Sequence, residues 1–398
     1  MNEQARVISG EEEAAYGWAS VNFLMGALLE NSKGQGTVVD PRLTYGALDL
    51  GGASTQISFY EPGEDIMSNL FKLQIGQAKH WNVYAHSFLR YGVNEAQERM
   101  RARLSWDKTV QERFAYGVHD PCLPGGSHKD FRSAVTFDKN GVEVLDKTLE
   151  PYSAIMVNDN DKGSWEECSG LVYQLLRKDS NAWCNYAHGG DCSFSGVYQP
   201  SLPLQSKSFG EFLGFSNFNH VWKFLQLPER SSLSEMLSET QHICSMSREE
   251  LLNFNDGFVN DDVAEEYCFR AVYVFHLLHN GYGFPLDYNI TATNVINGQK
   301  VGWALGAMLY EINTLPWNYE TKNHHGFIQN MKEGWKSGEK VEPYVLFLMV
   351  ATMVGLLLCL FKIQWNRKVQ HGKAQYEPID NCSGIEMESE KKPHRSIP

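Results

Sequence analysis

The stretch from Ala47 to Phe59, ALDLGGASTQISF, constrains this chain most. An apolar run that carries one carboxylate, Asp49, ends at Gly51-Gly52, and an alternating apolar-polar segment follows. This pattern predicts a β-hairpin with a glycine turn. Glycines have no side chain, so the backbone amides of such a turn can approach an anion closely. The stretch therefore fits a phosphate-binding turn, although an ordinary Gly-Gly hairpin has the same sequence pattern.

Polar side chains surround this predicted turn. Ser54, Thr55 and Gln56 add hydroxyl and amide groups directly after the glycines, and Asp49 precedes them. A carboxylate in this place can hold a hydrated divalent cation, which would bind a phosphate together with the turn. The alternative is that the hydroxyls only satisfy the turn and that Asp49 faces solvent.

The N-terminal region predicts a long helix with an acidic first turn. Ser9 and Glu12 have the spacing of a capping box, and apolar residues recur at helical spacing as far as Leu28. We expect the helix from about residue 10 to about residue 30. Glu12 is explained by the cap and the helix dipole. Glu13 lies about a third of a turn further round the helix and is a candidate catalytic residue.

Composition and charge limit the class of protein. The 398 residues suffice for two domains, and 42% of them are hydrophobic, so the chain can bury a core. The formal net charge of −13 argues against a nucleic-acid partner, which usually meets a basic surface. It does not exclude an anionic substrate, because a metal ion and a local turn can bind one.

Six of the eight cysteines lie between residues 122 and 268, and none of them forms a C-x-x-C pair. This distribution favours disulfides in an exported domain over a zinc site. The close pair Cys184 and Cys192, with His188 between them, fits either a small disulfide loop or a metal site.

The C-terminal part predicts a membrane anchor. Residues 344–361 are uncharged and mostly apolar, acidic residues precede them, and basic residues follow. The positive-inside rule places the large N-terminal part outside the cell and the tail in the cytosol. The glycosylation sequon at Asn289 agrees with export. No signal peptide or earlier membrane span precedes the anchor, so we expect the natural N-terminus to be missing from this sequence.

Shorter signals predict the remaining elements. We expect helices at about 93–103, 232–244, 261–278 and 302–316, and a strand at 193–198. Residues 105–165 are polar and glycine-rich and predict an irregular surface excursion.

Three blocks together resemble one family, the ecto-nucleoside triphosphate diphosphohydrolases or apyrases. They are ISGEEEAAYGW from Ile8, ALDLGGASTQISF from Ala47 and VGWALGAMLYEIN from Val301. The segments HSFLRYG and CSFSGVYQP and the predicted anchor add to the similarity, which covers residues 5–361. The resemblance implies an α/β fold of the actin-like (ribonuclease-H-like) type, with a mixed sheet flanked by helices, plus one C-terminal transmembrane helix.

The resemblance also implies a function and a site. Family members hydrolyse nucleoside tri- and diphosphates with Ca²⁺ or Mg²⁺, and in-line attack on phosphorus needs a positioned water and charge neutralisation. Glu13 would be the general base, Ser54 and Gln56 would orient the water, and Asp49 would bind the metal through its hydration shell. Further positions carried over are the phosphate-binding Gly51, Gly52, Ala53 and Ser54, the base-stacking His220 and the block tryptophan Trp303.

The sequence also departs from the family pattern. The family carries upstream blocks of the types DAGSS and GATAG, and neither is present here. We therefore expect impaired hydrolysis, and the alternative is a non-catalytic, membrane-anchored nucleotide-binding or interaction glycoprotein. Arg90 stands where family members have a cysteine, and the partner of that cysteine is also absent. The bridges that the resemblance then implies are Cys122–Cys168, Cys184–Cys192 and Cys244–Cys268.

The resemblance divides the chain into five parts. Residues 1–300 would form the second actin-like lobe and 301–316 the returning segment of the first lobe. A linker at 317–342, the transmembrane helix at 343–362 and a cytoplasmic tail at 363–398 would follow. The expected partners are nucleoside di- and triphosphates, the cell membrane and, in a homo-oligomer, further copies of the chain.

Overall fold

The computed structural model describes residues 7–28, 41–62, 69–74, 80–137, 143–144, 152–178, 182, 184, 192–204 and 211–314. The chain divides into two compact units, 1–316 and 317–398. All described residues belong to the first unit. The predicted linker, transmembrane segment and tail lie outside them. Among the residues that are described, no helix is long and apolar enough to cross a bilayer.

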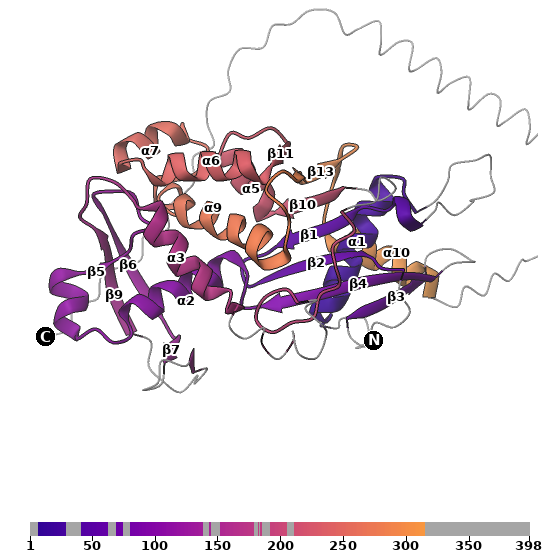
Figure 1. The fold of residues 1–398 in the computed structure, drawn as a ribbon, viewed down its shortest axis with the longest axis horizontal. Helices are drawn as coiled ribbons and strands as arrows, with labels where there is room; N and C mark the ends of the chain where they lie inside the picture. The colour runs from indigo at the N-terminus through magenta and orange to yellow at the C-terminus, as the bar shows by residue number, and fades with distance from the viewer. Residues whose placement is uncertain are drawn as a thin grey trace, which may run out of the picture. The chain divides into compact units, whose positions relative to one another are not determined.

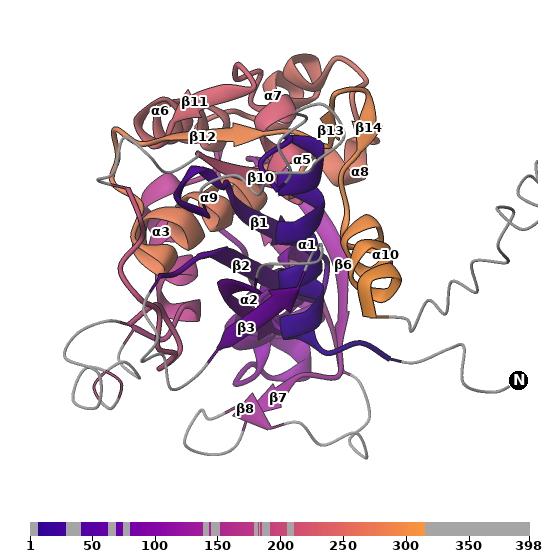
Figure 2. The same cartoon turned by 90° about the vertical axis from the view of Figure 1, so that its right-hand side faces the viewer.

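The first unit is built on a seven-stranded mixed sheet (Figures 1 and 2). In spatial order the strands are β11 (Arg230–Ser232), β12 (Asn289–Ala292), β10 (Phe212–Ser216), β1 (Gly46–Leu50), β2 (Ser54–Tyr60), β4 (His80–Leu89) and β3 (Leu70–Gln74). The neighbours β12, β10 and β1 run parallel, and the other pairs are antiparallel. The predicted glycine hairpin is confirmed as β1 and β2. The α/β class, with a mixed sheet flanked by helices, is confirmed too.

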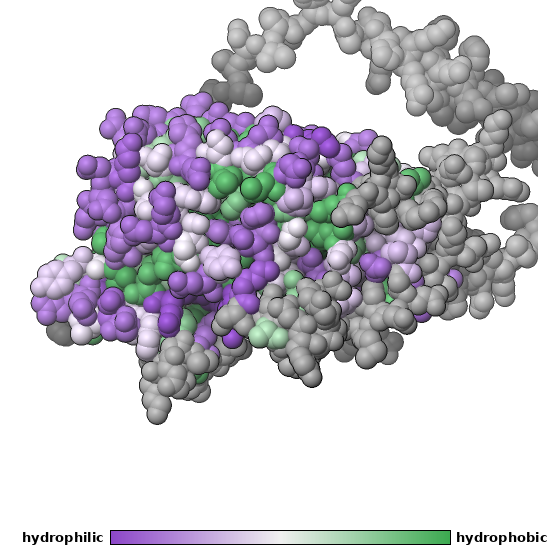
Figure 3. Space-filling model, in the orientation of Figure 1, coloured by the Kyte–Doolittle hydropathy of each residue, from purple (hydrophilic) through white to green (hydrophobic). Residues whose placement is uncertain are grey.

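Helices cover both faces of the sheet, because the strands are apolar on both. On one face, α1 (Gly10–Leu24) packs against Ala47, Leu213 and Phe215, and α10 (Trp303–Thr314) packs on α1. On the other face, α5 (Asn217–Phe224) and α9 (Tyr267–His276) share a cluster with Leu48 and Leu50. Figure 2 shows α1 and α10 on the near side of the strands and α9 on the far side. The outer surface seen in Figure 3 is largely hydrophilic, with smaller apolar patches between the polar residues.

Helix α1 confirms the predicted capping box. The Ser9 hydroxyl accepts from the Glu12 amide at 3.1 Å, and the Glu12 carboxylate accepts from the Ser9 amide at 2.8 Å. The helix ends at Leu24, earlier than expected, because Gly26 takes a φ of 72° and turns the chain. The apolar spacing continues to Leu28 because Ala27 and Leu28, which follow the exposed turn, are buried.

The block that begins at Val301 is anchored to α1 by a close backbone approach. A Cβ atom on Gly306 would lie 1.9 Å from the Tyr16 carbonyl oxygen, so only glycine fits there. The Ser20 hydroxyl donates to the Gly302 carbonyl at 2.6 Å and accepts from the Gly306 amide at 2.7 Å. These contacts join two of the three family-like blocks, which are far apart in the sequence.

The helices predicted at 93–103 and 232–244 are confirmed as α2 (Val93–Ser105) and α6 (Leu233–Cys244), and the one predicted at 261–278 is divided into α8 (Asp261–Ala264) and α9. Helices α3 (Trp165–Leu175), α5 and α7 (Arg248–Asn255) were not predicted. A π-helical turn, η4 (Leu277–Tyr282), continues α9 and ends at Gly283, beyond the predicted end of that helix. Short segments are η1 (Pro41–Leu43) and η2 (Glu112–Tyr116), and a hairpin pairs β13 (Val295–Ile296) with β14 (Gln299–Lys300).

Two local predictions are wrong. Residues 105–165 contain a three-stranded sheet, β5 (Val118–His119), β9 (Tyr152–Asn158) and β6 (Ser127–Ser133), and a hairpin of β7 (Thr136–Phe137) and β8 (Glu143–Val144). The inward-facing side of β6 is itself mostly polar, with Phe131 as the one apolar residue of the strand, so the sequence shows no apolar-polar alternation. The expected strand at 193–198 is a turn in which Ser195 and Gly196 have φ values of 55° and 74°. Only an isolated bridge joins Cys192 to Tyr198.

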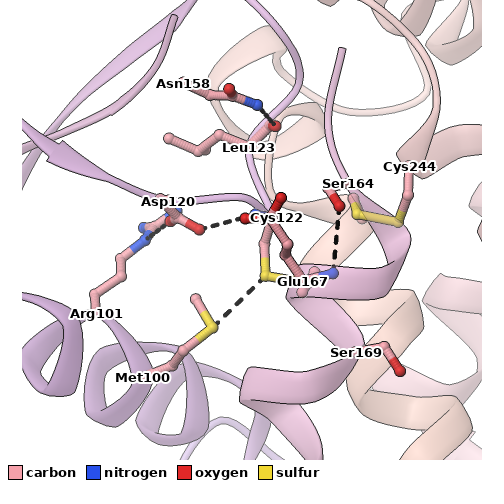
Figure 4. Close-up of a disulfide and its surroundings, with 12 residues drawn as sticks. Met100, Arg101, Asp120, Cys122, Leu123, Asn158, Ser164, Glu167, Ser169 and Cys244 are labelled. Carbon is pink, nitrogen blue, oxygen red and sulfur yellow. Dashed lines mark hydrogen bonds and ion pairs between the residues drawn. A yellow bond between two sulfur atoms is a disulfide. The ribbon is translucent and has the colours of Figure 1, made fainter. Parts of the chain in front are cut away.

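The three implied disulfides are confirmed: Cys122–Cys168, Cys184–Cys192 and Cys244–Cys268. The Cys122–Cys168 bridge joins the segment after β5 to α3. Figure 4 shows Cys122 beside Ser164 and Glu167 at the start of that helix. Next to it, the buried Asp120 accepts from Arg101 at 2.9 Å and from the Cys122 amide at 3.0 Å. The alternative of a metal site at Cys184 and Cys192 is excluded by their disulfide.

Candidate active site

Three polar side chains form a row across the centre of the sheet. Asp49 on β1 is directly opposite Gln56 on β2, and Gln56 is directly opposite Ser87 on β4. Directly opposite residues of antiparallel strands point to the same face. This face is the one that α1 covers. The strands therefore present a carboxylate, an amide and a hydroxyl to the first turn of α1.

The amide of Gln56 connects this row to Glu13. Its Nε2 atom lies 3.0 Å from Glu13 Oε2, 2.9 Å from Ser54 Oγ and 3.1 Å from Ser87 Oγ. A carboxylate only accepts hydrogen bonds, so the Gln56 nitrogen must face Glu13 and its carbonyl oxygen must face elsewhere. The structure thus brings together the three predicted catalytic residues, Glu13, Ser54 and Gln56.

Ser87 is a site residue that the sequence analysis missed. It also contacts the start of α1, since a Cβ atom on Gly10 would lie 2.4 Å from the Ser87 Cβ atom. A glycine at the first position of α1 therefore lets the helix approach the sheet closely enough for Glu13 to reach Gln56. The signal was present in HSFLRYG, where the serine has the alternation of a strand, but only the register places it beside Gln56.

The glycine turn is held by the beginning of α2. The Gly51 carbonyl accepts from the Val93 amide at 3.0 Å, and the Gly52 carbonyl accepts from the amides of Asn94 and Glu95. The Gly51 amide donates to the Ser54 carbonyl at 2.9 Å. The amides of Gly52 and Ala53 donate to no group in the described part of the chain. These two amides can therefore donate to solvent or to an anion.

The pKa values of both carboxyl groups of the site are raised. Burial raises the pKa of Asp49 to about 6, and the negative charge of Glu13 adds to this shift, while hydrogen bonds from the Ser216 hydroxyl and the Leu50 amide oppose it. Burial also raises the pKa of Glu13. Neither forms an ion pair with a lysine, arginine or histidine that the structure describes. Two partly buried carboxylates without a basic partner form a region of uncompensated negative charge.

This donor set fits a hydrated divalent cation. Hard cations such as Ca²⁺ and Mg²⁺ prefer oxygen ligands, and Mg²⁺ keeps several of its waters. Asp49 offers carboxylate oxygens beside the Ser216 hydroxyl. Within the described ranges, no group of three or more His, Cys, Asp or Glu residues is placed to hold a metal directly. The residues present thus fit an ion bound through its water shell.

Two further interactions support Asp49 and went unnoticed in the sequence. The Thr55 hydroxyl donates to the Asp49 carbonyl at 2.9 Å and lies 3.0 Å from the buried Tyr282 hydroxyl, which therefore donates to it. On the other side, the Asn217 side chain donates to the Leu50 carbonyl at 2.7 Å. Tyr282 and Asn217 come from distant segments, so local patterns could not connect them with Asp49.

Two carried-over residues lie outside this cluster. His220 is exposed on α5, and no contact in the described part links it to Glu13 or Asp49. Partial desolvation of the ring lowers its pKa most, and the positive charges of Lys223 and Arg270 lower it further. Trp303 begins α10 and is 39% exposed. The structure therefore brings neither residue into the Glu13–Gln56–Ser54 group.

The chain has recognisable relatives. Residues 1–329 match the GDA1/CD39 (nucleoside phosphatase) family. Ectonucleoside triphosphate diphosphohydrolase 1 of Bos taurus is 33% identical over 323 residues, which are 78% of this chain and 59% of that protein. Probable apyrase 6 of Arabidopsis thaliana is 30% identical over 329 residues, which are 81% of this chain and 53% of that protein. The chain thus spans little more than half the length of these curated relatives.

A solved structure is also similar. A nucleoside triphosphate hydrolase from Neospora caninum aligns with a TM-score of 0.48 and 15% sequence identity, over 78% of this chain and 65% of that one.

Proposed function

Because this chain belongs to the GDA1/CD39 family of nucleoside phosphatases, we propose that it acts in the hydrolysis of nucleoside tri- and diphosphates to monophosphate and phosphate. The observation that carries the proposal is the shared hydrogen bonding of one atom. Gln56 Nε2 donates to both Glu13 and Ser54. Beside them lies the glycine turn, in which two backbone amides have no acceptor in the described part of the chain. This arrangement suits a water that attacks a phosphoryl group.

In this proposal Glu13 is the general base that takes a proton from the attacking water. The pKa of Glu13 is raised toward neutral pH, and a general base is more effective when its pKa lies near the working pH. Ser54 and Gln56 orient the water. The turn at Gly51 presents the Gly52 and Ala53 amides to the terminal phosphate. Because the donors are fixed before the substrate binds, they stabilise developing charge without reorganisation.

The proposed cofactor is Ca²⁺ or Mg²⁺, held through water by Asp49. A bound divalent cation would neutralise phosphate charge and orient the substrate. The chain's own contribution is to fix the backbone at Asp49, whose carbonyl oxygen accepts from the Thr55 hydroxyl. His220 remains the proposed residue for stacking on the nucleotide base, as the resemblance implies.

We further propose that the protein acts at the outer face of the cell membrane and is anchored by residues 343–362. Three disulfides are typical of proteins from oxidising compartments, which supports an extracellular location. Asn289, in the sequon, lies partly exposed at the start of β12 and fits glycosylation.

Hydrolysis by the 398 residues alone is expected to be slower than in longer relatives, because the sequence lacks the DAGSS and GATAG blocks. The alternative function is nucleotide binding without catalysis. The two differ in one observable property, which is phosphate release that depends on Glu13.

The test compares the wild-type chain with Glu13→Gln and Glu12→Gln. Phosphate release from ATP and ADP is measured with Mg²⁺, with Ca²⁺ and with EDTA, and binding of Mg²⁺·ADP is measured by calorimetry. Glu12→Gln is the matched control, since it removes a charge from the same helical turn while glutamine can still complete the capping box.

We expect the wild-type chain to bind Mg²⁺·ADP and to release phosphate only with a divalent cation. Glu13→Gln should lower release about 10²–10⁴-fold with binding retained, which is the usual effect of losing a general base. Glu12→Gln should resemble wild type. Wild-type binding with no release would support the alternative function, and no nucleotide binding at all would refute the proposal.

A further inference from the structure

A serine, a histidine and an asparagine outside the proposed nucleotide site are joined by two short hydrogen bonds. Ser169 Oγ on α3 lies 2.7 Å from His276 Nε2, and His276 Nδ1 lies 2.7 Å from Asn280 Oδ1. His276 is the last residue of α9, and Asn280 follows four residues later in the π-helical turn η4. The proposed nucleotide hydrolysis uses none of these three residues.

The positions of the protons in this Ser169–His276–Asn280 triad follow from the asparagine. An amide oxygen only accepts hydrogen bonds, so His276 Nδ1 carries the proton that it donates to Asn280. In the neutral ring, Nε2 then has a free lone pair, and it accepts from the Ser169 hydroxyl. A hydroxyl, a base and a group that orients the base thus stand in the order that activates a serine for nucleophilic attack.

The surroundings of His276 keep its ring neutral and fixed. The residue is buried, and burial lowers its pKa most; the hydrogen bond to Asn280 opposes this shift and the neighbouring His279 adds to it. The ring of Trp165 lies nearly parallel to the imidazole, at an interplanar angle of 9°, and the ring of Tyr173 meets it at 65°. A neutral imidazole can take the proton of a hydroxyl, so His276 can act as a general base.

The serine is more accessible than its base. Ser169 is half-buried, and the next residue, Gly170, is exposed. A Cβ atom on Gly170 would meet nothing within 4 Å, so there is open space beside the serine. Figure 4 shows the Ser169 hydroxyl pointing away from Cys122. Glu166 and Glu167 are exposed in the first turn of the same helix, and their negative charge favours an uncharged reagent over an anionic one.

We propose that Ser169 is a nucleophilic serine, activated by His276 and oriented through Asn280, which uncharged activated esters acylate. In this step Ser169 Oγ attacks the carbonyl carbon of the ester. The bond between Oγ and that carbon forms, and the bond from the carbon to the leaving alkoxide or phenolate breaks. The hydroxyl proton passes to His276 Nε2 and from there to the leaving group. The triad is separate from the nucleotide site, so this inference does not rest on the proposed function.

The helix around Ser169 limits what happens after the first acylation. The backbone amides of α3 donate along the helix, as the Cys168 amide does to the Ser164 carbonyl at 3.0 Å. They are therefore not available as an oxyanion hole, which rapid turnover of an ester requires. We expect one acyl group to be added to Ser169 and to be released slowly.

The test compares Ser169 with another helical serine of the same full chain. Ser234 on α6 is exposed, and its hydroxyl lies 3.0 Å from the hydroxyl of Ser232 in place of a histidine. The folded protein is treated with p-nitrophenyl acetate, which is an uncharged activated ester. Peptide mass spectrometry then follows the acetylation of each serine with time. Exposure alone would make Ser234 the faster of the two.

We expect Ser169 to be acetylated at least about 100-fold faster than Ser234, which is the lower end of what a general base contributes. A rate at Ser169 that is within about tenfold of the rate at Ser234, or below it, would overturn the proposal. This comparison is made within one wild-type protein, so it does not depend on the folding of a variant.

Two substitutions of Asn280 test whether the triad acts as a unit. Asn280→Ala removes the acceptor for the proton on His276 Nδ1, so acetylation of Ser169 should slow about tenfold or more, as expected for the loss of one hydrogen bond. Asn280→Asp keeps an acceptor and adds a charge that stabilises the imidazolium, so its rate should equal or exceed that of wild type. Acetylation of Ser234 should be the same in all three proteins.

The Asn280 variants also separate activation from a merely structural role. If the Ser169 hydroxyl only satisfied a buried ring nitrogen, Asn280→Ala would leave its acetylation unchanged, and that result would overturn the proposal. Equal slowing by Asn280→Ala and Asn280→Asp would also overturn it, because the aspartate retains the orienting acceptor.

Discussion

The side-chain amide of Gln56 donates a 3.0 Å hydrogen bond to the carboxylate of Glu13, 43 residues earlier in the chain. The bond links the second strand of the glycine hairpin to the first turn of α1. The same nitrogen reaches the hydroxyls of Ser54 and Ser87. One buried amide thus organises the polar centre of the site.

Removing this amide should impair the site more than the fold. Gln56→Leu keeps the volume of the side chain but leaves Glu13, Ser54 and Ser87 without their common donor. We expect phosphate release to fall about 100-fold, as for the loss of one preorganised donor. The measurement is release of phosphate from ATP under saturating Mg²⁺.

Gln97→Leu is the control for Gln56→Leu. The Gln97 side chain is also buried, but its Nε2 atom has no hydrogen-bond partner in the part that the structure describes. Replacing an unsatisfied polar group with an apolar one is neutral or stabilising. Equal loss of activity in both variants would show that Gln56 contributes only packing.

The contact between Gly10 and Ser87 should be intolerant of a single methyl group. Gly10→Ala would place a Cβ atom 2.4 Å from the Ser87 Cβ atom, and overpacking of this kind costs about 1–3 kcal/mol. Denaturant unfolding measures the loss. The double variant Gly10→Ala/Ser87→Gly should recover part of it, because it removes the opposing atom.

Gly170→Ala serves as the comparison for Gly10→Ala. Gly170 lies within α3, and a Cβ atom there would meet nothing within 4 Å. An alanine in an open helical position should stabilise the protein by about 0.5–1 kcal/mol. Stabilisation by Gly10→Ala as well would contradict the close approach of α1 to β4.

The pKa of Asp49 predicts how stability changes with pH in metal-free protein. The folded-state pKa is raised from 3.8 to about 6, so the folded state binds the proton more tightly than the unfolded state. Stability should therefore fall as pH rises from about 4 to about 6, by up to about 3 kcal/mol. Asp49→Asn removes this cost. In EDTA it should raise the free energy of unfolding at pH 7.5 and leave it almost unchanged at pH 4.

Asp287→Asn, which replaces an exposed carboxylate, is the control for this experiment. Its unfolding curves should match those of the wild-type protein at both pH values. Saturating Mg²⁺ should reduce the benefit of Asp49→Asn at pH 7.5, because a bound cation stabilises the charged carboxylate. Identical pH dependence in wild type and Asp49→Asn would show that this carboxylate is not responsible.

The disulfides should contribute according to the length of chain that they close. Cys122 and Cys168 are 46 residues apart, and Cys184 and Cys192 are 8 apart. Loop-closure entropy gives about 4 kcal/mol for the first bridge and about 2.5 kcal/mol for the second. Replacing each pair with alanine and comparing urea midpoints tests this order. A larger loss for the short loop would point to strain or contacts in place of entropy.

Local patterns in the sequence determined much of the local structure. The capping box at Ser9 and the Gly-Gly hairpin at Leu50 depend on neighbours within a few residues, and both form as predicted. The mixed α/β organisation follows in the same way from alternating strands and amphipathic helices. Strand β6 was missed because six of its seven residues are polar, including the buried Ser127 and Ser133.

Local sequence patterns could not predict the disulfide pairing or the family. Both predictions came from the resemblance of whole sequence blocks to that family. Six cysteines allow fifteen pairings, and spacing alone does not select one of them. The ordered set of blocks selected the pairing that the structure shows.

Only the tertiary structure decided which polar groups meet at the site. Glu13 comes from a helix, and Asp49, Gln56 and Ser87 come from three strands. Strand register and the approach of α1 bring them together, and both depend on contacts between segments far apart in the sequence. A sequence pattern shows which side chains share one element. It does not show which elements become neighbours, because burial of the whole core determines that arrangement.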